Sequence, residues 1–225
     1  MNTQDINKRI RLIMKLRTMG IGDTNVLGAI EKVPREYFVP EAVIDQAWDD
    51  IALPIGRGQT ISQPFVVASM TAALELSDRD TVLEIGTGCG YQTAILCRLV
   101  RRVYTIERHK PLLDDAVVRF EQLKIRNVTA IAADGMQGWP TMRGAEAAQF
   151  DKIIVTAAAR DKPPQALLDQ LKVGGILIIP VGESGAQVLR RYKKESDDTY
   201  AMRDLMDVRF VPLLPDLAGN VEAVA

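Results

Sequence analysis

Residues Thr81–Ala94 read TVLEIGTGCGYQTA. A short apolar run typical of a buried strand ends in alternating glycines, Gly86, Gly88 and Gly90, and a segment that favours a helix follows. In a doubly wound sheet, a glycine-rich turn between the first strand and its helix lets a ligand contact the backbone. This stretch therefore predicts an α/β fold with a ligand site at the turn.

The same alternation continues after this stretch. Strands are predicted within residues 101–107 (RRVYTIE), 128–134 (VTAIAAD), 150–159 (FDKIIVTAAA) and 176–182 (ILIIPVG). Helices are predicted between them, at about 90–99, 111–125 and 163–175, the last beginning at proline and ending at glycine. Strands that alternate with helices predict a mostly parallel, doubly wound sheet covered by helices.

The flanking segments follow different patterns. Apolar residues at helical spacing predict a helix that ends at Gly20, and a second helix over residues 24–33. Residues 34–62 are predicted to be irregular, and a helix to begin near Pro64. Two strand-like runs at 187–195 and 200–214 predict a C-terminal antiparallel hairpin. We therefore predict a single domain over 1–225, made of an N-terminal helical extension (1–62), a core (63–182) and C-terminal strands (183–225).

Composition limits the classes of function. The chain has 225 residues and a formal net charge of −1, so it lacks the basic excess typical of proteins that bind nucleic acid. No apolar run approaches the ~20 residues that span a membrane. The two cysteines, Cys89 and Cys97, indicate neither a disulfide framework nor a metal site. A cytoplasmic enzyme or binding protein without a metal is expected.

Acidic residues at predicted strand ends indicate which ligand the glycine turn binds. The dinucleotide pattern G-x-G-x-x-G fails at Tyr91, whereas E-x-G-x-G-x-G is complete from Glu84. A carboxylate beside the loop repels a pyrophosphate and suits a cationic ligand. Glu107 ends the second strand, where a carboxylate can accept both ribose hydroxyls, and Asp134 ends the third. The pattern favours S-adenosylmethionine (AdoMet) over a dinucleotide.

A second unusual stretch is Ile55–Met70, which reads IGRGQTISQPFVVASM. Two hydroxyl side chains, Thr60 and Ser62, lie between a glycine-flanked turn and Pro64, with no histidine, cysteine or acid beside them. From local sequence alone, Ser62 is consistent with an ordinary helix cap. A cap residue also lies among exposed N–H groups that favour anions, so both roles are compatible.

Taken together, IGRGQTISQP, VLEIGTGCGYQTAIL, VYTIERH, FDKIIVTAAA, LKVGGILIIPVG and VRFVPL, in order from Ile55 to Leu213, carry a resemblance to a known family. The chain resembles the protein-L-isoaspartate (D-aspartate) O-methyltransferases, which have a Rossmann-like AdoMet-dependent fold. The resemblance implies methylation of the α-carboxylate of L-isoaspartyl residues in damaged proteins and peptides. The ester then recloses to a succinimide, part of which hydrolyses to normal aspartate.

The resemblance also implies roles for individual residues. Ser62 matches the active-site serine of the family, and Thr60 its helper. Residues implied to contact AdoMet are Glu84, Gly86, Thr87, Gly88, Gly90, Glu107, Asp134, Gly135 and Thr156. Those implied to contact substrate are Ile61, Gln63 and Val211. The segment AADGMQGW lacks a glycine that the family often has before Asp134. His109 receives no role, and Trp48 and Trp139 are expected to pack in the interior.

Two other functions remain open from the sequence: a carboxyl methyltransferase for a small molecule, and a non-catalytic AdoMet-binding module. A nucleic-acid methyltransferase is disfavoured. The segment VTAAARDKPP has no Asn/Asp-Pro-Pro-aromatic motif, and neither cysteine follows a proline. A monomer is expected.

Overall fold

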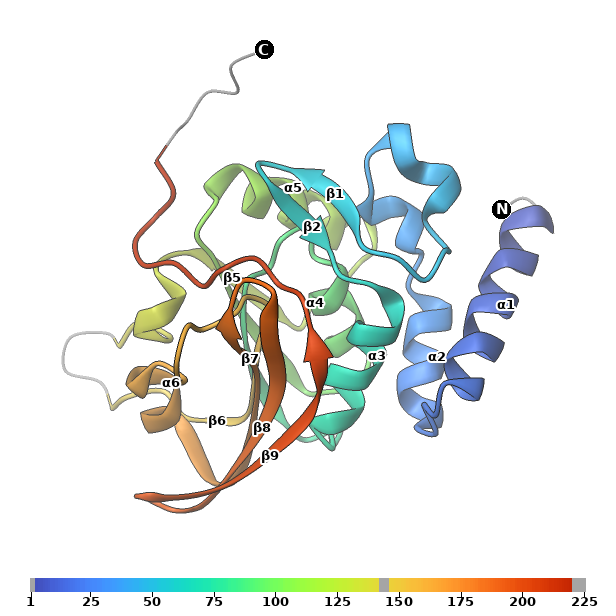
Figure 1. The fold of residues 1–225 in the computed structure, drawn as a ribbon. Helices are drawn as coiled ribbons and strands as arrows, with labels where there is room; N and C mark the ends of the chain where they lie inside the picture. Colours follow the sequence, from blue (N-terminus) through green and yellow to red (C-terminus); the bar gives the residue numbers. More distant parts are fainter. Residues whose placement is uncertain (1–2, 142–145, 220–225) are drawn as a thin grey trace.

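The computed structural model describes residues 3–141 and 146–219. A seven-stranded sheet runs through its centre, with strand order β5-β4-β3-β6-β7-β8-β9 (Figure 1). The strands are β3 (Thr81–Ile85), β4 (Arg102–Glu107), β5 (Val128–Ala132), β6 (Phe150–Val155), β7 (Leu171–Glu183), β8 (Ala186–Ser196) and β9 (Thr199–Val208). Strands β3 to β7 pair in parallel, and β7, β8 and β9 pair antiparallel. The predicted α/β fold with a C-terminal antiparallel hairpin is confirmed.

The order of the strands places the ligand site. The chain proceeds from β3 outward to β4 and β5, and then crosses to β6 on the other side of β3. Connections that leave β3 in one direction and reach β6 from the other create a switch point between these strands. Ligands of open α/β sheets bind outside the carboxyl ends of the strands at such a point. The glycine turn predicted from the sequence follows β3 directly.

The helices are α1 (Thr3–Thr18), α2 (Thr24–Lys32), α3 (Pro64–Ala73), α4 (Tyr91–Leu96), α5 (Lys110–Gln122) and α6 (Gln165–Asp169), with 3-10 turns at Arg35–Phe38, Glu41–Gln46 and Gly135–Gln137. Alternate side chains of β6 face two different cores. Ile153 and Val155 pack in the cluster that contains Leu167 of α6, and Ile154 packs with Leu74, which follows α3. Across the described residues, the helices are all too short or too polar to cross a bilayer.

The predicted helix over Pro163–Gly175 is wrong at its C-terminal half. Helix α6 ends at Asp169, and β7 begins at Leu171, which pairs with Phe150. The register shifts between Phe150 and Lys152, and Gly174 within this part of β7 has a positive φ of 82°. A glycine pair that suggests a helix end instead accommodates an irregularity in a strand.

Two other boundaries also differ from the prediction. Within residues 34–62, a small antiparallel hairpin forms from β1 (Leu53–Gly56) and β2 (Gln59–Ile61), joined through Arg57 and Gly58. At the other end of the chain, β9 ends at Val208, and residues 209–214 leave the sheet. The hairpin and the segment 209–214 both lie at the carboxyl edge of the parallel strands, where they line one cleft.

The N-terminal helices share a core with the helices of the sheet. Leu16 of α1 and Ile30 of α2 are fully buried and pack in one cluster with Val67 of α3 and Ile95 of α4. Asp23 is the N-cap of α2, and its carboxylate accepts the backbone N–H groups of Asn25 and Val26. The extension therefore packs as part of the molecule, beside α3 and α4 (Figure 1).

Candidate active site

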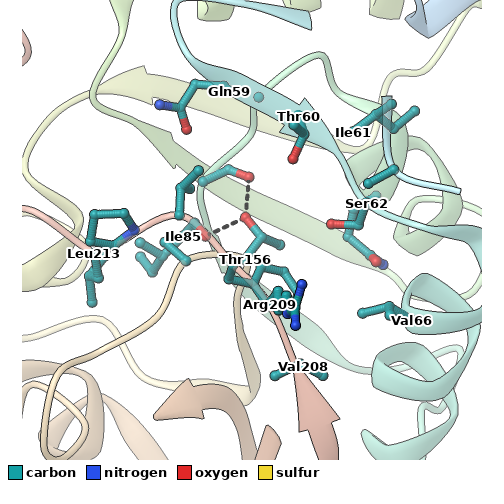
Figure 2. A pocket seen from close by; sticks show the side chains of 18 of the residues that line it. Gln59, Thr60, Ile61, Ser62, Val66, Ile85, Thr156, Val208, Arg209 and Leu213 are labelled. Atoms are coloured by element: carbon teal, nitrogen blue, oxygen red, sulfur yellow. Dashed lines mark hydrogen bonds between the residues drawn. The ribbon is translucent and has the colours of Figure 1, made fainter. Parts of the chain in front are cut away.

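A cleft of about 930 Å³ opens at the carboxyl ends of β3, β4 and β6. Its walls come from the β1–β2 hairpin and the start of α3, from the glycine turn after β3, from the ends of β4 and β6, and from the C-terminal segment after β9. Figure 2 shows these side chains around one space. Segments more than a hundred residues apart in sequence thus meet at the switch point of the sheet.

Glu107 anchors the glycine turn. One oxygen of its carboxylate accepts the N–H of Gly88 at 2.8 Å, and the other accepts the N–H of His109 at 2.8 Å. Each carboxylate oxygen has a further lone pair, so Glu107 can still accept hydroxyl groups from a ligand. The side chain is 5% exposed and lines the cleft.

Glu84 lies beneath the turn and does not line the cleft. Its side chain is fully buried, and one oxygen accepts the hydroxyls of Thr93 at 2.5 Å and Thr105 at 2.7 Å. The other oxygen has no hydrogen-bond partner in the described residues. Burial raises the pKa of Glu84 to about 7, against the opposing effect of the two hydroxyls. The sequence predicted that the Glu84 carboxylate lies beside the glycine turn and faces the ligand. In the structure this carboxylate lies beneath the turn, outside the lining of the cleft.

Thr156 joins the ends of β6 and β3. Its hydroxyl lies 3.0 Å from the carbonyl oxygen of Ile85 and 2.7 Å from that of Gly86 (Figure 2). Gly86 has a φ of 95°, and a Cβ at this position would collide with the Thr156 hydroxyl. Glycine is therefore required here both for the backbone conformation and for the close approach of the two strands.

The two hydroxyls of the β2 segment face the cleft. Thr60 pairs with Pro54 in the hairpin, and Ser62 follows β2, so the hairpin fixes where both backbones lie. Among the described residues, neither hydroxyl makes a hydrogen bond within the protein. Ser62 does not cap α3, whose N-cap is Gln63 without a side-chain cap bond. Figure 2 shows both hydroxyls on the side of the cleft that faces Thr156.

The C-terminal segment forms the facing wall. Ala158 donates its N–H to the carbonyl of Val211 at 2.8 Å and accepts the N–H of Leu213 at 2.8 Å. The amide of Gln187 accepts the N–H of Phe210 at 2.6 Å and donates to its carbonyl at 3.1 Å. Val211, which the family resemblance implies to contact substrate, thus has its carbonyl oxygen bonded within the chain.

The cleft brings together most of the residues that the sequence singled out. Those lining it are Thr60, Ile61, Ser62, Gln63, Gly86, Thr87, Gly88, Glu107, Gly135, Thr156 and Val211. Three are not among the lining residues: Glu84 lies beneath the turn, Gly90 lies against Phe120, and the partly buried Asp134 caps the turn Gly135–Gln137 by accepting the N–H of Met136 at 2.8 Å. Within the described residues, no group of three His, Cys, Asp or Glu side chains is arranged to hold a metal.

Several cleft residues were not predicted from sequence. His109 lines the cleft beside Glu107, and its partial burial lowers its pKa. Arg209 is exposed at the C-terminal wall. Arg209 belongs to the motif VRFVPL, so the sequence could have predicted that it lies near the site. Cys89 lies in the glycine turn, and burial raises the pKa of its thiol to about 11, so it is not a reactive thiolate.

Comparisons with known proteins agree with this geometry. Residues 7–217 match the sequence profile of the family described as protein-L-isoaspartate(D-aspartate) O-methyltransferase (PCMT). A protein-L-isoaspartate O-methyltransferase from Rhodospirillum centenum is 56% identical over 213 residues, which cover 94% of this chain and 93% of that protein. The enzyme of the same name from Caulobacter vibrioides is 50% identical over 210 residues, 93% of this chain and 92% of that protein.

Solved structures of low sequence identity share the fold. The Plasmodium falciparum protein-L-isoaspartate O-methyltransferase in complex with S-adenosyl-L-homocysteine superposes with a TM-score of 0.78 at 28% identity, over 91% of this chain and 97% of that chain. Another protein-L-isoaspartate O-methyltransferase superposes with a TM-score of 0.82 at 28% identity, over 93% of this chain and 67% of that chain. With its glycine turn, its acid at the end of β4 and its paired hydroxyls on one cleft, the chain belongs to the protein-L-isoaspartate (D-aspartate) O-methyltransferase family.

Proposed function

We propose that this chain methylates the α-carboxylate of L-isoaspartyl residues in damaged proteins and peptides, with AdoMet as methyl donor, and so starts their repair through a succinimide. One observation carries the assignment of the site. Ser62 and Thr60 present two neutral hydroxyls to the cleft, across from Thr156, and neither is bonded to a group that could take its proton. Such a pair suits an acceptor that is already ionised.

The cleft fits AdoMet on its own chemistry. A Cβ at Gly86 would collide with the Thr156 hydroxyl, so only glycine lets the turn lie against the end of β6 at the cleft. Glu107 has free lone pairs for ribose hydroxyls, and Glu84 beneath the turn places a titratable acid near a cationic ligand. In this proposal Gly88, Thr87, Gly135 and Thr156 contact the donor directly. Asp134, beside Gly135, also contacts the donor, and Glu84 and Gly90 hold the turn that carries it.

The chemistry of the acceptor explains why the hydroxyl pair needs no general base. AdoMet supplies a methyl group on a sulfonium, which is already activated. A carboxylate is deprotonated at neutral pH and is already a nucleophile. The protein therefore has to orient one carboxylate oxygen, exclude water and leave its charge available. Hydroxyl donors hold an anion more weakly than an arginine clamp and reduce its nucleophilicity less.

The peptide that carries the acceptor lies, in this proposal, between two walls of the cleft. Ile61 and Gln63 flank Ser62 on one wall, and Val211 lies on the other. Because the carbonyl of Val211 is already bonded to Ala158, we assign Val211 a side-chain contact with the peptide. We further propose that the protein acts as a cytoplasmic monomer, without nucleic acid or membrane. The net charge of −1 supports the absence of a nucleic-acid partner.

The test compares two peptides that differ only in L-isoaspartate or L-aspartate, incubated with methyl-labelled AdoMet. We expect base-labile methyl ester on the isoaspartyl peptide alone. Ser62→Ala should lower kcat about 10- to 100-fold, because the hydroxyl orients the carboxylate oxygen toward the methyl group and a small misplacement of a reacting group costs about 100-fold. Ser196→Ala, at an exposed position of β8 outside the cleft, is the matched control and should leave kcat unchanged.

Other outcomes separate the alternatives. Label on both peptides would contradict the specificity proposed here. Label on neither peptide, with AdoMet still bound, would point to a small-molecule acceptor or a non-catalytic module. Full activity of Ser62→Ala would remove the hydroxyl from the mechanism while leaving the reaction in place.

A further inference from the structure

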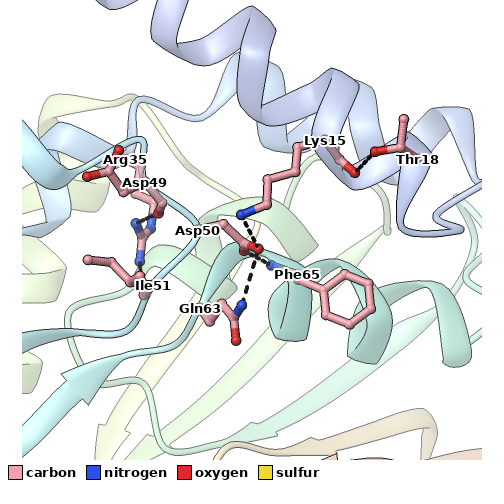
Figure 3. A network of polar contacts seen from close by, with 8 residues as sticks. All are labelled: Lys15, Thr18, Arg35, Asp49, Asp50, Ile51, Gln63 and Phe65. Carbon is pink, nitrogen blue, oxygen red and sulfur yellow. Dashed lines mark hydrogen bonds and ion pairs between the residues drawn. The ribbon is translucent and has the colours of Figure 1, made fainter.

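The corner between β2 and α3 is held by side chains from the N-terminal extension that do not line the cleft. This corner comprises Ser62, Gln63, Pro64 and Phe65, and Figure 3 shows the polar contacts around it. Because the Ser62 hydroxyl has no hydrogen-bond partner among the described residues, its position depends on the backbone on either side. The groups that fix this backbone therefore bear on the reaction.

Asp50 holds the helix side of the corner. Its side chain is 1% exposed, and one carboxylate oxygen accepts the N–H of Phe65 at 2.8 Å. The other oxygen accepts the side-chain amide of Gln63 at 3.2 Å and lies 3.3 Å from the ammonium of Lys15. Since Gln63, the N-cap of α3, makes no side-chain cap bond itself, Asp50 supplies the cap from a distant part of the chain.

Arg35 holds the other side. Its guanidinium is buried and donates to the carbonyl of Ser62 at 3.0 Å. It also donates to the carbonyls of Ala47, at 2.6 Å, and Ile51, at 3.1 Å, which bracket Asp50. Burial lowers the pKa of Arg35. Its two terminal nitrogens donate to these carbonyls, whereas its Nε has no hydrogen-bond partner among the described residues. One side chain thus ties the loop that carries Asp50 to the residue that carries the hydroxyl.

We propose that Asp50 is a positioning residue for methyl transfer, which acts by holding the backbone corner that carries Ser62. This rests on the proposed function. Asp50 lies outside the lining of the cleft, whereas Ser62 and Gln63 lie within it. An effect of Asp50 on catalysis must therefore pass through the corner. The AdoMet side of the cleft is built from other elements, so binding of the donor should not depend on Asp50.

The test is Asp50→Ala, with kcat for the isoaspartyl peptide expressed per AdoMet-binding site measured by calorimetry. We expect kcat to fall about 10- to 100-fold, because small displacements of an orienting group cost this much. AdoMet affinity should change less than about 2-fold. Asp50→Asn keeps an oxygen that can accept the Phe65 N–H and should recover most of the rate. Asp49→Ala removes the neighbouring exposed carboxylate and is the matched control.

A double-mutant comparison tests the route of the effect. If Asp50 acts through Ser62, adding Asp50→Ala to Ser62→Ala should reduce kcat less than about 2-fold further. If the fall in kcat of the double variant equals the product of the falls in the two single variants, the proposal is wrong. An unchanged kcat per binding site in Asp50→Ala would also overturn it. If Asp50 only stabilised the fold, Asp50→Ala would lower the melting temperature and leave kcat per AdoMet-binding site unchanged.

A measurement without turnover separates this inference from the proposed function. Hydrogen exchange at the Phe65 amide should speed up in Asp50→Ala and not in Asp50→Asn or Asp49→Ala. If the wild-type protein methylates neither peptide, the proposed function is wrong, and the exchange rate still shows whether Asp50 holds the corner. Unchanged exchange in Asp50→Ala would overturn the inference even in an active enzyme.

Discussion

At the scale of single residues, Glu84 is a titratable carboxyl group buried away from water. Its carboxylate is fully buried under the glycine turn, with two threonine hydroxyls on one oxygen and no partner on the other among the described residues. Burial raises its pKa from an ordinary 4.5 to about 7, and the nearby charge of Glu107 adds to this. Protonation of one residue is thereby linked to the stability of the fold.

The sign of this linkage gives a prediction. The folded protein holds the Glu84 proton more tightly than the unfolded chain does, so Glu84 contributes most stability below the unfolded pKa. That contribution falls as the pH rises through about 7. Between about pH 5 and about pH 8, the free energy of unfolding should therefore fall more in the wild type than in Glu84→Gln.

Denaturant titrations at the two pH values measure this difference. Glu121→Gln, at an exposed position of α5, should follow the wild-type curve. The lowered pKa of His109 contributes a slope of opposite sign in every variant and cancels in the comparison. Parallel curves for the wild type and Glu84→Gln would show that Glu84 ionises normally in the folded protein.

At the scale of elements, the glycine turn is held by its packing against α5. Gly90 precedes α4 with a φ of 93°, and a Cβ there would lie 2.7 Å from a ring carbon of Phe120 and 3.2 Å from the Cβ of Ala116. Phe120 is buried in α5, so its ring has little room to move. Gly90 thus sets how closely two crossover helices approach each other behind the cofactor side of the cleft.

We expect Gly90→Ala to destabilise the protein by about 2–5 kcal/mol, the sum of left-handed backbone strain and overpacking. Gly20→Ala isolates the first contribution, because Gly20 has a φ of 101° but nothing within 4 Å of a Cβ. It should lose only about 1–2 kcal/mol. Denaturant unfolding of both variants measures the difference. Equal losses would mean that Phe120 moves aside without penalty.

At the scale of the whole molecule, the N-terminal extension and the helices that cover the sheet share buried contacts. One core cluster contains Leu16 of α1, Ile30 of α2 and Ile95 of α4, and the Arg35 guanidinium lies 5.5 Å from the Tyr91 ring at the start of α4. Separate folding of either part would expose this shared surface to water. The prediction of a single domain therefore becomes a prediction of cooperative unfolding.

The two tryptophans make this measurable. Trp48 lies in the extension, and Trp139 packs against Tyr104 of β4 with ring centroids 4.8 Å apart. Fluorescence of Trp48→Phe and Trp139→Phe should report each part separately, and both should melt at the same temperature once corrected for the substitution. Calorimetry of the wild type should give one transition. Two separated midpoints would divide the chain into two folding units.

The sequence by itself determined the features that local patterns encode. The glycine turn after β3, the alternation of strands with helices, and the hydroxyl pair before Pro64 are all local, because they depend on side-chain periodicity and turn chemistry. These local patterns predict the fold class. Together with the family resemblance, they also predict most of the residues that line the cleft. The predicted helix over Pro163–Gly175 fails for the same reason, since a glycine pair marks either a helix end or a strand irregularity.

Only the tertiary structure decided which distant groups meet. The Asp50 carboxylate caps a helix that begins at Pro64, and Arg35 bonds the carbonyl of Ser62, 27 residues away. The Ala158 backbone fastens the C-terminal wall at Val211. Buried polar groups must find partners, but no local pattern names the partner, because the choice depends on which loops packing brings together. The chemical groups of the site can thus be predicted from the sequence, whereas the contacts that hold them in place depend on how the folded chain packs.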